Sequence, residues 1–276
     1  MEVGKIGCKY IKRMDNRRLN NKISLIIPTY NAPDKLHRAL TSVFLNRHSK
    51  NIEIIVVNDC STTDYNKVIY HWIKQGMNLK YIKNKENVGA GVSRQIGIDK
   101  AKNEWIGFMD DDDLISENWY TVLDNAIDMN TDKDILAFKI LHKHDDEEQT
   151  NISMLHNHVG GYLIRKKFLI DNNIKFDNWL RYSEDKYFIN LCMYCAIYEN
   201  RVAFVNNTLY FWETDNREST THTNKIDWNF TGNHSTVLQF LWLKENKPEI
   251  YEHINEVKEK FREFRNKAVD ISMKKF

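Results

Sequence analysis

Two uninterrupted runs of apolar, largely β-branched residues place the strongest limit on how this chain can fold. They are ISLIIP at residues 23–28 and IEIIVVND at residues 52–59. Runs that are apolar almost throughout are typical of strands covered on both faces in a parallel sheet. Between them, residues 33–45 carry apolar side chains at helical spacing and begin with Pro33, which suits the first turn of a helix. Together the three segments predict a βαβ unit.

The alternation of strand-like and helix-like segments continues through the first half of the chain. Helices are predicted over 64–75, 89–102 and 116–129, and strands over 79–84, 104–110 and 134–140. Elements that alternate at this length indicate an α/β fold, in which helices cover both faces of a mostly parallel sheet. Later segments predict a helix over 184–198, a strand over 202–213 and further helices near the C-terminus.

We expect three parts along the chain. Residues 1–22 form a basic arm, residues 23–215 form the α/β domain, and residues 216–276 form a helical extension packed on that domain. The arm holds seven Lys or Arg against Glu2 and Asp15, although the net charge of the whole chain is only +2. Such an arm is either a solvated tail or a contact for a polyanion or an acidic membrane surface.

Cysteine content and hydropathy favour a cytoplasmic protein. Four cysteines in 276 residues are too few for a disulfide scaffold. The sequence contains neither a signal-peptide hydrophobic region nor eighteen consecutive apolar residues. Cys192 and Cys195 form a C-x-x-C within a predicted helix, but no second Cys or His pair stands at metal-binding spacing. We therefore interpret both as core residues rather than as a zinc or redox site.

Four consecutive aspartates, Asp110 to Asp113, directly follow the apolar run WIGFM. Like charges crowded at the end of a strand repel one another unless a cation or hydrogen-bond donors offset them. Mg²⁺ and Mn²⁺ prefer oxygen ligands of this kind. Ligands of α/β sheets bind at the carboxyl ends of the strands, where Asp59 ends a second predicted strand. The sequence thus predicts a ligand site at this edge, with an acidic surface turn as the alternative.

Four segments, in this order, resemble the signature segments of family 2 glycosyltransferases. They are SLIIPTYN (24–31), VVNDCSTTD (56–64), NVGAGVSRQIGIDKAKNEWIGFMDDDDL (87–114) and IKFDNWLRYSEDKYF (174–188). The resemblance covers roughly residues 22–215. It implies a GT-A fold, which is a Rossmann-like α/β/α sandwich, and an inverting sugar transfer from a nucleotide sugar that depends on a DXD motif.

The resemblance also implies which residues bind the nucleotide. They are Pro28, Tyr30, Asn31, Asp59, Asn87, Gly89 and Arg94, and Asp59 corresponds to the acid that reads the base. The family pattern around Asp59 is usually Asp-Asp-Gly-Ser, so Asn58 and Cys60 depart from it, and Gln95 replaces the usual Asn after Arg94. Loss of the glycine at position 60 leaves the shape of this loop open.

By the same resemblance the four aspartates have different roles. Asp110 is the first acid of the DXD motif, near the ribose, and Asp112 binds the metal. Asp111 stands at the variable position of the motif, beside the nucleotide, where it adds charge. Asp113 braces the turn or a nearby helix N-terminus. Asp111 and Asp113 satisfy Asp-x-Asp spacing as well, so the register of the motif stays open.

Further site residues are implied downstream. Asp185 corresponds to the base that deprotonates the acceptor hydroxyl, with Glu184 beside it as a positioning residue. In isolation, such an acidic pair would equally suit the first turn of a helix. The remaining candidates are His222 as a metal ligand or a surface histidine, Arg217 facing the diphosphate, and Gly160 and Gly161 near the donor sugar or acceptor or in a tight turn.

The chemistry of sugar transfer suits these residue types. A departing diphosphate calls for a metal, here Mn²⁺ or Mg²⁺, and a hydroxyl nucleophile calls for a carboxylate within reach. No side chain indicates a covalent intermediate, which favours a single displacement with inversion. By family habit the donor is a UDP-sugar. We expect one sugar per event on a surface glycan or lipid-linked oligosaccharide, because no membrane spans and no Gln-x-x-Arg-Trp motif of processive synthases occur.

Three alternatives remain open at this stage. The basic arm and Lys-rich C-terminal segments are compatible with transfer to hydroxymethylated bases of viral DNA. A non-catalytic relative that only binds nucleotide or glycan is disfavoured by the presence of Asp110, Asp112 and Asp185. A nucleotidyltransferase is disfavoured because the chain lacks a G-x-x-x-x-G-K-[ST] loop.

Overall fold

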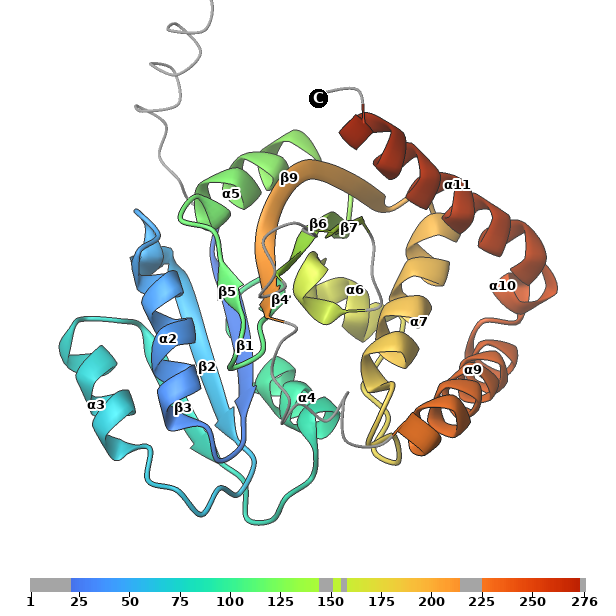
Figure 1. Ribbon diagram of the computed structural model, residues 1–276. Helices are drawn as coiled ribbons and strands as arrows, with labels where there is room; N and C mark the ends of the chain where they lie inside the picture. Colours follow the sequence, from blue (N-terminus) through green and yellow to red (C-terminus); the bar gives the residue numbers. More distant parts are fainter. Residues whose placement is uncertain (1–20, 144–150, 155–157, 214–224, 274–276) are drawn as a thin grey trace, which may run out of the picture.

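A computed structural model describes residues 21–143, 151–154, 158–213 and 225–273. Its centre is a twisted nine-stranded sheet with helices on both faces (Figure 1). The strands are β1 (Ile23–Thr29), β2 (Ile52–Asn58), β3 (Leu79–Lys83), β4 (Trp105–Phe108), β5 (Leu114–Ile115), β6 (Ile135–Lys143), β7 (Asn151–Met154), β8 (Tyr162–Arg165) and β9 (Val202–Glu213). This is the predicted α/β/α sandwich.

The sheet is parallel on its N-terminal side and mixed on the other. Its order is β3-β2-β1-β4-β8-β6-β9-β5, with β7 paired to β6. The pairs β3–β2, β2–β1 and β1–β4 are parallel, whereas β8 runs antiparallel to both β4 and β6. Because β1, β2 and β4 run in one direction, their carboxyl ends meet at one edge of the sheet.

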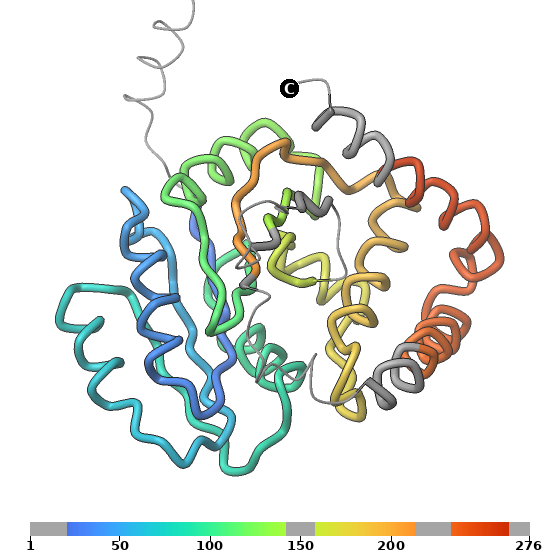
Figure 2. Tube along the Cα trace, in the orientation of Figure 1, coloured from blue at the N-terminus to red at the C-terminus, as the bar shows by residue number. Residues whose placement is uncertain are grey.

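Nine α-helices and two 3-10 turns complete the described part of the chain. They are α2 (Pro33–Phe44), η1 (Ser49–Asn51), α3 (Asn66–Lys74), α4 (Ala90–Lys100), α5 (Trp119–Met129), η2 (Val159–Gly161), α6 (Lys166–Asp171), α7 (Glu184–Tyr198), α9 (Lys225–Asn246), α10 (Pro248–Glu252) and α11 (Ile254–Met273). Figure 2 shows α9 to α11 following one another along the side of the molecule next to α7.

Side chains of alternate residues in the strands build two separate cores. Ile23, Leu25 and Ile27 of β1 pack with α2, α3 and α5, whereas Ile26 packs on the opposite face with α4, α6 and α7. Both faces of the sheet are therefore covered, which explains why the first two strands are apolar almost throughout.

Helix α7 is the most deeply enclosed helix of the second core. Every residue from Tyr187 to Ile197 is buried, because the sheet lies on one side and α9 and α11 contact the other. Cys192 and Cys195 are both free and buried. Burial raises the pKa of the Cys195 thiol to about 12, so both cysteines are core residues, as predicted.

Several elements were not predicted, and some predicted segments lie outside the described residues. The strands β5, β7 and β8 and the helix α6 are short, and β5 and β8 depend on sheet partners distant in the sequence. Residues 1–20 of the basic arm lie outside the described residues. Among the described helices, none combines the length and apolar character needed to cross a membrane.

The loop after β2 keeps a glycine-like backbone without a glycine. Cys60 has φ of 61°, a left-handed conformation that costs a non-glycine residue about 1 kcal/mol. Its thiol Sγ donates a hydrogen bond to the carbonyl of Lys85 at 3.3 Å. The departure from the family pattern at position 60 thus leaves the left-handed turn in place.

Cys60→Val should lower the free energy of unfolding by about 1–2 kcal/mol, because a β-branched side chain tolerates positive φ poorly. Cys60→Gly should stay near the wild-type value, since relief of strain offsets the greater freedom of the unfolded chain. Urea denaturation measures both variants. Equal stability of the Val and Gly variants would contradict the backbone argument.

Candidate active site

The loops at the carboxyl ends of β1 and β2 are tied together by Asn31. Its φ is 51°, and its side-chain oxygen accepts hydrogen bonds from the backbone N–H of Thr62 at 2.9 Å and of Thr63 at 3.4 Å. The backbone N–H of Asn31 donates to the Ser61 hydroxyl at 2.8 Å. Tyr30, by contrast, is exposed and open to a ligand. Pro28 lies within the buried strand β1.

Asp59 organises the loop that leads into α4. Its carboxylate accepts hydrogen bonds from the backbone N–H of Val88 and of Gly89, both at 2.8 Å, and from the Asn84 amide at 3.0 Å. Asn87 donates to the Asp59 carbonyl at 3.3 Å. Both carboxylate oxygens are thus engaged within the protein, so the contacts show that Asp59 holds this loop. Its role in nucleotide binding stays a prediction.

A single buried guanidinium, Arg94, joins the two acidic parts of the site. It lies on α4 and is only 3% exposed. One terminal nitrogen is 2.6 Å from Asp110, and the other is 2.7 Å from Asp185 and 3.0 Å from Glu184. Its Nε has no hydrogen-bond partner among the described residues. Arg94 was predicted to bind nucleotide, but all its ion pairs in the described structure are with carboxylates.

The three carboxylates around Arg94 raise the pKa of its guanidinium. Burial opposes the charged form, but Asp185, Asp110 and Glu184 outweigh burial and raise the pKa of Arg94 well above its ordinary value. The guanidinium therefore stays charged and holds the three acids together.

Glu184 and Asp185 form the first turn of α7. Burial, with the neighbouring Asp185 charge, raises the pKa of Glu184 to about 7. Burial also raises the pKa of Asp185, and Arg94 opposes that shift. Asp185 further accepts a hydrogen bond from the Val159 N–H at 3.4 Å. A carboxylate with a raised pKa that is held in place at the start of a helix is suited to accept a proton.

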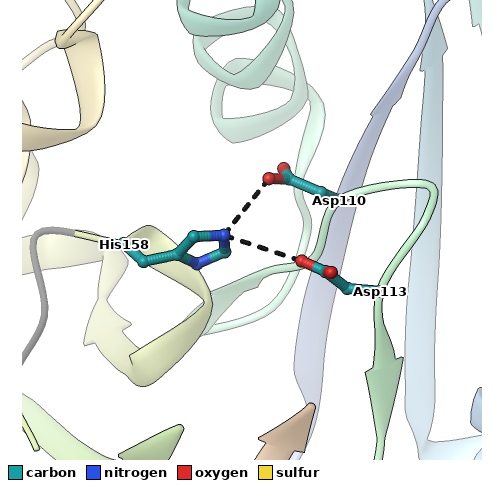
Figure 3. Close-up of side chains that lie close together, drawn as sticks. All are labelled: Asp110, Asp113 and His158. Atoms are coloured by element: carbon teal, nitrogen blue, oxygen red, sulfur yellow. Dashed lines mark ion pairs between the residues drawn. The ribbon is translucent and has the colours of Figure 1, made fainter. Parts of the chain in front are cut away.

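His158 connects two of the four aspartates, as Figure 3 shows. Its Nε2 lies 3.3 Å from an Asp110 oxygen and 3.6 Å from an Asp113 oxygen. The ligand atoms of these three residues all lie within 4.8 Å of one another, close enough to hold one metal ion. His158 was not predicted from the sequence; its position just before the two glycines that were singled out was the available signal.

His158 and Tyr210 both contact Asp113, which is the buried aspartate of the four. Burial opposes the imidazolium, but hydrogen bonding and the charge of Asp110 raise the pKa of His158 to about 9. Asp113 is 1% exposed, and burial raises its pKa to about 8. Tyr210 donates a hydrogen bond to Asp113 at 2.6 Å and accepts one from the Asp110 N–H at 3.1 Å. These contacts brace the turn, as predicted for Asp113.

The other two aspartates face different surroundings. Asp111 accepts a hydrogen bond from the Thr29 hydroxyl at 2.5 Å, and burial raises its pKa to about 7. The Asp112 side chain is 25% exposed and lies 3.9 Å from the Lys35 ammonium. Asp112, the predicted metal ligand, is not part of the cluster of Asp110, Asp113 and His158.

Gly160 and Gly161 are buried behind the site. A Cβ at Gly160 would lie 2.4 Å from the Tyr210 ring, and one at Gly161 would lie 3.0 Å from Ile140. The close approach that requires glycine is therefore to protein side chains, not to an open ligand surface. Arg217 and His222 lie outside the described residues.

A mostly parallel sheet whose carboxyl edge carries a DXD-like acidic turn, next to a helix that begins with a second acidic pair, is the arrangement expected of a GT-A fold. The chain belongs to glycosyl transferase family 2, whose family model matches residues 24–188.

Several relatives share this region. The chain is 27% identical over 209 residues to the poly(ribitol-phosphate) β-N-acetylglucosaminyltransferase TarS of Staphylococcus aureus, covering 70% of this chain and 35% of TarS. It is 27% identical over 184 residues to the glycosyltransferase GlyA of Streptococcus pneumoniae, covering 67% of this chain and 25% of GlyA. The matched region is thus about a third or less of either relative.

Solved structures agree with this fold. S. aureus TarS residues 1–349 in complex with UDP-GlcNAc superimposes with a TM-score of 0.71 at 22% identity, covering 86% of this chain and 70% of that one. The mannosyltransferase PcManGT of Pyrobaculum calidifontis, in complex with GDP-Man and Mn²⁺, gives a TM-score of 0.61 at 13% identity, covering 92% and 75%. At these identities the likeness establishes the fold alone.

Proposed function

We propose that this family 2 glycosyltransferase moves one sugar from a UDP-sugar to a hydroxyl acceptor with inversion, using Asp185 as the general base. The bridge through Arg94 is the observation that carries the proposal, because it holds Asp185 and Asp110 on two sides of one buried guanidinium. Asp110 is the acid expected near the donor, and Asp185 is the acid expected near the acceptor. The ion pairs with Arg94 fix the positions of these two acids relative to each other.

In this mechanism Asp185 accepts the proton of the acceptor hydroxyl as that oxygen attacks the anomeric carbon. The bond from that carbon to the diphosphate oxygen breaks in the same step, so configuration inverts. Asp110 holds the ribose side of the donor, and Glu184 helps to position Arg94 and the acceptor. A bound Mn²⁺ or Mg²⁺ would stabilise the charge of the departing diphosphate.

Two sets of residues are candidates for holding that metal. Asp113 is almost completely buried and already accepts a hydrogen bond from Tyr210, and the His158 imidazolium partly offsets its charge and that of Asp110. Asp112 is far more exposed than Asp113. A metal ion that also contacts a diphosphate needs a ligand that is not already enclosed within the protein. Of the two sets, we therefore propose Asp112, with His222 as a second ligand, as the metal-binding residues.

Asp112→Asn should abolish the dependence of activity on Mn²⁺ or raise the half-saturating Mn²⁺ concentration by roughly tenfold or more. Asp113→Asn should instead lower thermal stability and leave that concentration nearly unchanged. Donor hydrolysis titrated with Mn²⁺ measures the first quantity and thermal melting the second. Loss of the Mn²⁺ response in the Asp113 variant alone would favour the cluster with His158.

The donor is proposed from relatives. TarS has been solved with UDP and with UDP-GlcNAc, whereas PcManGT was solved with GDP-Man. UDP-, GDP-, CMP- and dTDP-sugars should be screened for Mn²⁺-dependent thermal stabilisation of this protein. We expect stabilisation by a UDP-sugar; stabilisation by none of the four would argue against the proposed function.

The acceptor we propose is a surface glycan or lipid-linked oligosaccharide. TarS is named for transfer to poly(ribitol phosphate). A Campylobacter jejuni relative, 35% identical over 107 residues, is a glucosyltransferase named for a polyprenyl-linked glycan. Transfer to modified DNA bases rests chiefly on the basic arm, which lies mostly outside the described residues.

Activity should decline with falling pH at a value above the ordinary aspartate pKa of about 4. Asp185 must be deprotonated to accept a proton, and burial raises its pKa, so protonation inactivates it at a higher pH than in an exposed aspartate. The acid limb of kcat/KM against pH measures this. A limb at or below pH ~4 would contradict the assignment of Asp185 as the base.

A further inference from the structure

We propose that Trp179 is a stacking platform for a pyranose ring of the acceptor. This inference rests on the proposed function and names the chemical class of acceptor that the site takes, a glycan with ring sugars.

The Trp179 side chain is 89% exposed, which is the highest exposure among the large hydrophobic residues of the described part of the chain. A single exposed apolar residue is common on protein surfaces and needs no explanation in itself. Trp179 differs in two respects. Hydrogen bonds hold the backbone around it, and the chain that follows it leads into the helix that carries the proposed base.

Local hydrogen bonds fix the turn that displays Trp179. The backbone N–H of Trp179 donates to the Asp177 carboxylate at 2.7 Å, and that of Leu180 donates to the same oxygen at 3.2 Å. Phe176 before the turn and Leu180 after it are buried. The exposed indole thus stands between two anchored positions, which limits the entropy lost when a ligand orders it.

The same turn is clamped to the nucleotide side of the site. Arg181 donates to the Asn87 side-chain oxygen at 2.9 Å and to the Asn87 carbonyl at 3.1 Å. A Cβ at Gly89 would lie 3.4 Å from Arg181. Asn87 and Gly89 belong to the loop that Asp59 organises, so the Trp179 turn forms part of the rim of the active site.

Trp179 also lies close to the proposed base along the chain. Six Cα–Cα steps separate it from Asp185, so their Cα atoms are at most about 23 Å apart, and less in a folded turn. The acceptor must approach Asp185, because that residue takes its proton. The chain from Asp177 to Ser183 runs directly into the helix that begins with Glu184. The turn that displays Trp179 is therefore joined to the proposed base and not to the loops that follow β1 and β2.

The chemistry of the rim suits a sugar ring. Carboxylates and Arg94 dominate the centre of the site, and they can bond hydroxyls but offer no apolar contact. A pyranose ring has an apolar face of C–H groups, which pack on the flat indole surface while the hydroxyls stay in water. A nucleic-acid base would stack on the same surface, so the experiment must separate the two ligand classes.

The test uses the full chain and a microarray of pyranose-containing bacterial glycans, with duplex DNA and poly(ribitol phosphate) as the other two probes. Trp179→Ala should weaken binding to the glycans that the wild type binds by roughly tenfold or more, and Trp179→Phe should keep most of it. Tyr70→Ala is the matched control, because Tyr70 is another exposed aromatic residue, on α3, and its loss should change nothing.

Hydrolysis of UDP-GlcNAc in the presence of Mn²⁺ separates this inference from the proposed function. We expect Trp179→Ala to hydrolyse the donor with wild-type KM and kcat. If the wild type neither hydrolyses nor is stabilised by any nucleotide sugar, the proposed function fails. If hydrolysis is intact, the platform proposal is overturned by unchanged glycan binding in Trp179→Ala, by binding of the wild type to DNA or poly(ribitol phosphate) alone, or by binding to no probe.

Discussion

Asp185→Asn should lower kcat by about 10²–10⁴, equivalent to roughly 3–5 kcal/mol of activation free energy. The amide keeps the shape of the side chain and can still meet Arg94, but it cannot accept a proton from the attacking hydroxyl. Steady-state turnover of the UDP-sugar identified by the donor screen measures the effect. Donor KM should change little, because the loss falls on the transition state and not on donor binding.

Asp171→Asn is the matched control for this substitution. Asp171 is an exposed aspartate at the end of α6, paired only with Lys167 on the same helix in the described structure, and its substitution should leave kcat unchanged. Glu184→Gln should reduce kcat less than Asp185→Asn does. Wild-type turnover by Asp185→Asn would remove Asp185 from the mechanism.

Arg94→Met should destabilise the fold by about 3–5 kcal/mol at neutral pH, because removing one member of a buried ionic group leaves the others uncompensated. Asp110, Glu184 and Asp185 would then keep only the His158 imidazolium as a neighbouring cation. The pKa values of all three carboxyl groups would therefore rise above their values in the wild type. Protonation relieves that repulsion, so the destabilisation should shrink as pH falls from 7 toward 5. Urea denaturation of both proteins across this range measures the difference.

Two further variants separate charge from geometry at this position. Arg94→Lys keeps the charge but cannot bond two groups in the fork geometry of a guanidinium, so it should recover much of the stability and less of the activity. Lys100→Met removes an exposed cation from the same helix and should be nearly neutral. A pH-independent loss in Arg94→Met would show that packing, not charge, explains the effect.

Prediction from the sequence succeeded where one local pattern determines one element. The helix predicted over 184–198 and the strand predicted over 202–213 have those bounds in the structure. Both segments are rich in apolar residues, which made them recognisable in the sequence. Strand β8 was missed because its four residues are held by β4 and β6, and nothing within so short a segment specifies such partners.

In the site, resemblance identified Asp110, Asp185 and Glu184, and the structure brings all three to Arg94. The structural role of Arg94 was not predicted, since its partners lie 16, 90 and 91 residues away in the chain. His158 was missed for the same reason: its contacts with Asp110 and Asp113 exist only when η2 packs beside β4.

Patterns within the sequence were enough to predict the α/β class, the parallel half of the sheet and the strand edge at which the acids gather. Those features follow from hydropathy periods and from the rule that ligands bind at the carboxyl ends of parallel strands. Which charged side chains meet became apparent from the folded chain alone. The fold joins Asp110 to Asp185 through Arg94 and places His158 between Asp110 and Asp113. Ion pairs depend on distances in space, and buried charges persist only where the whole fold supplies their partners.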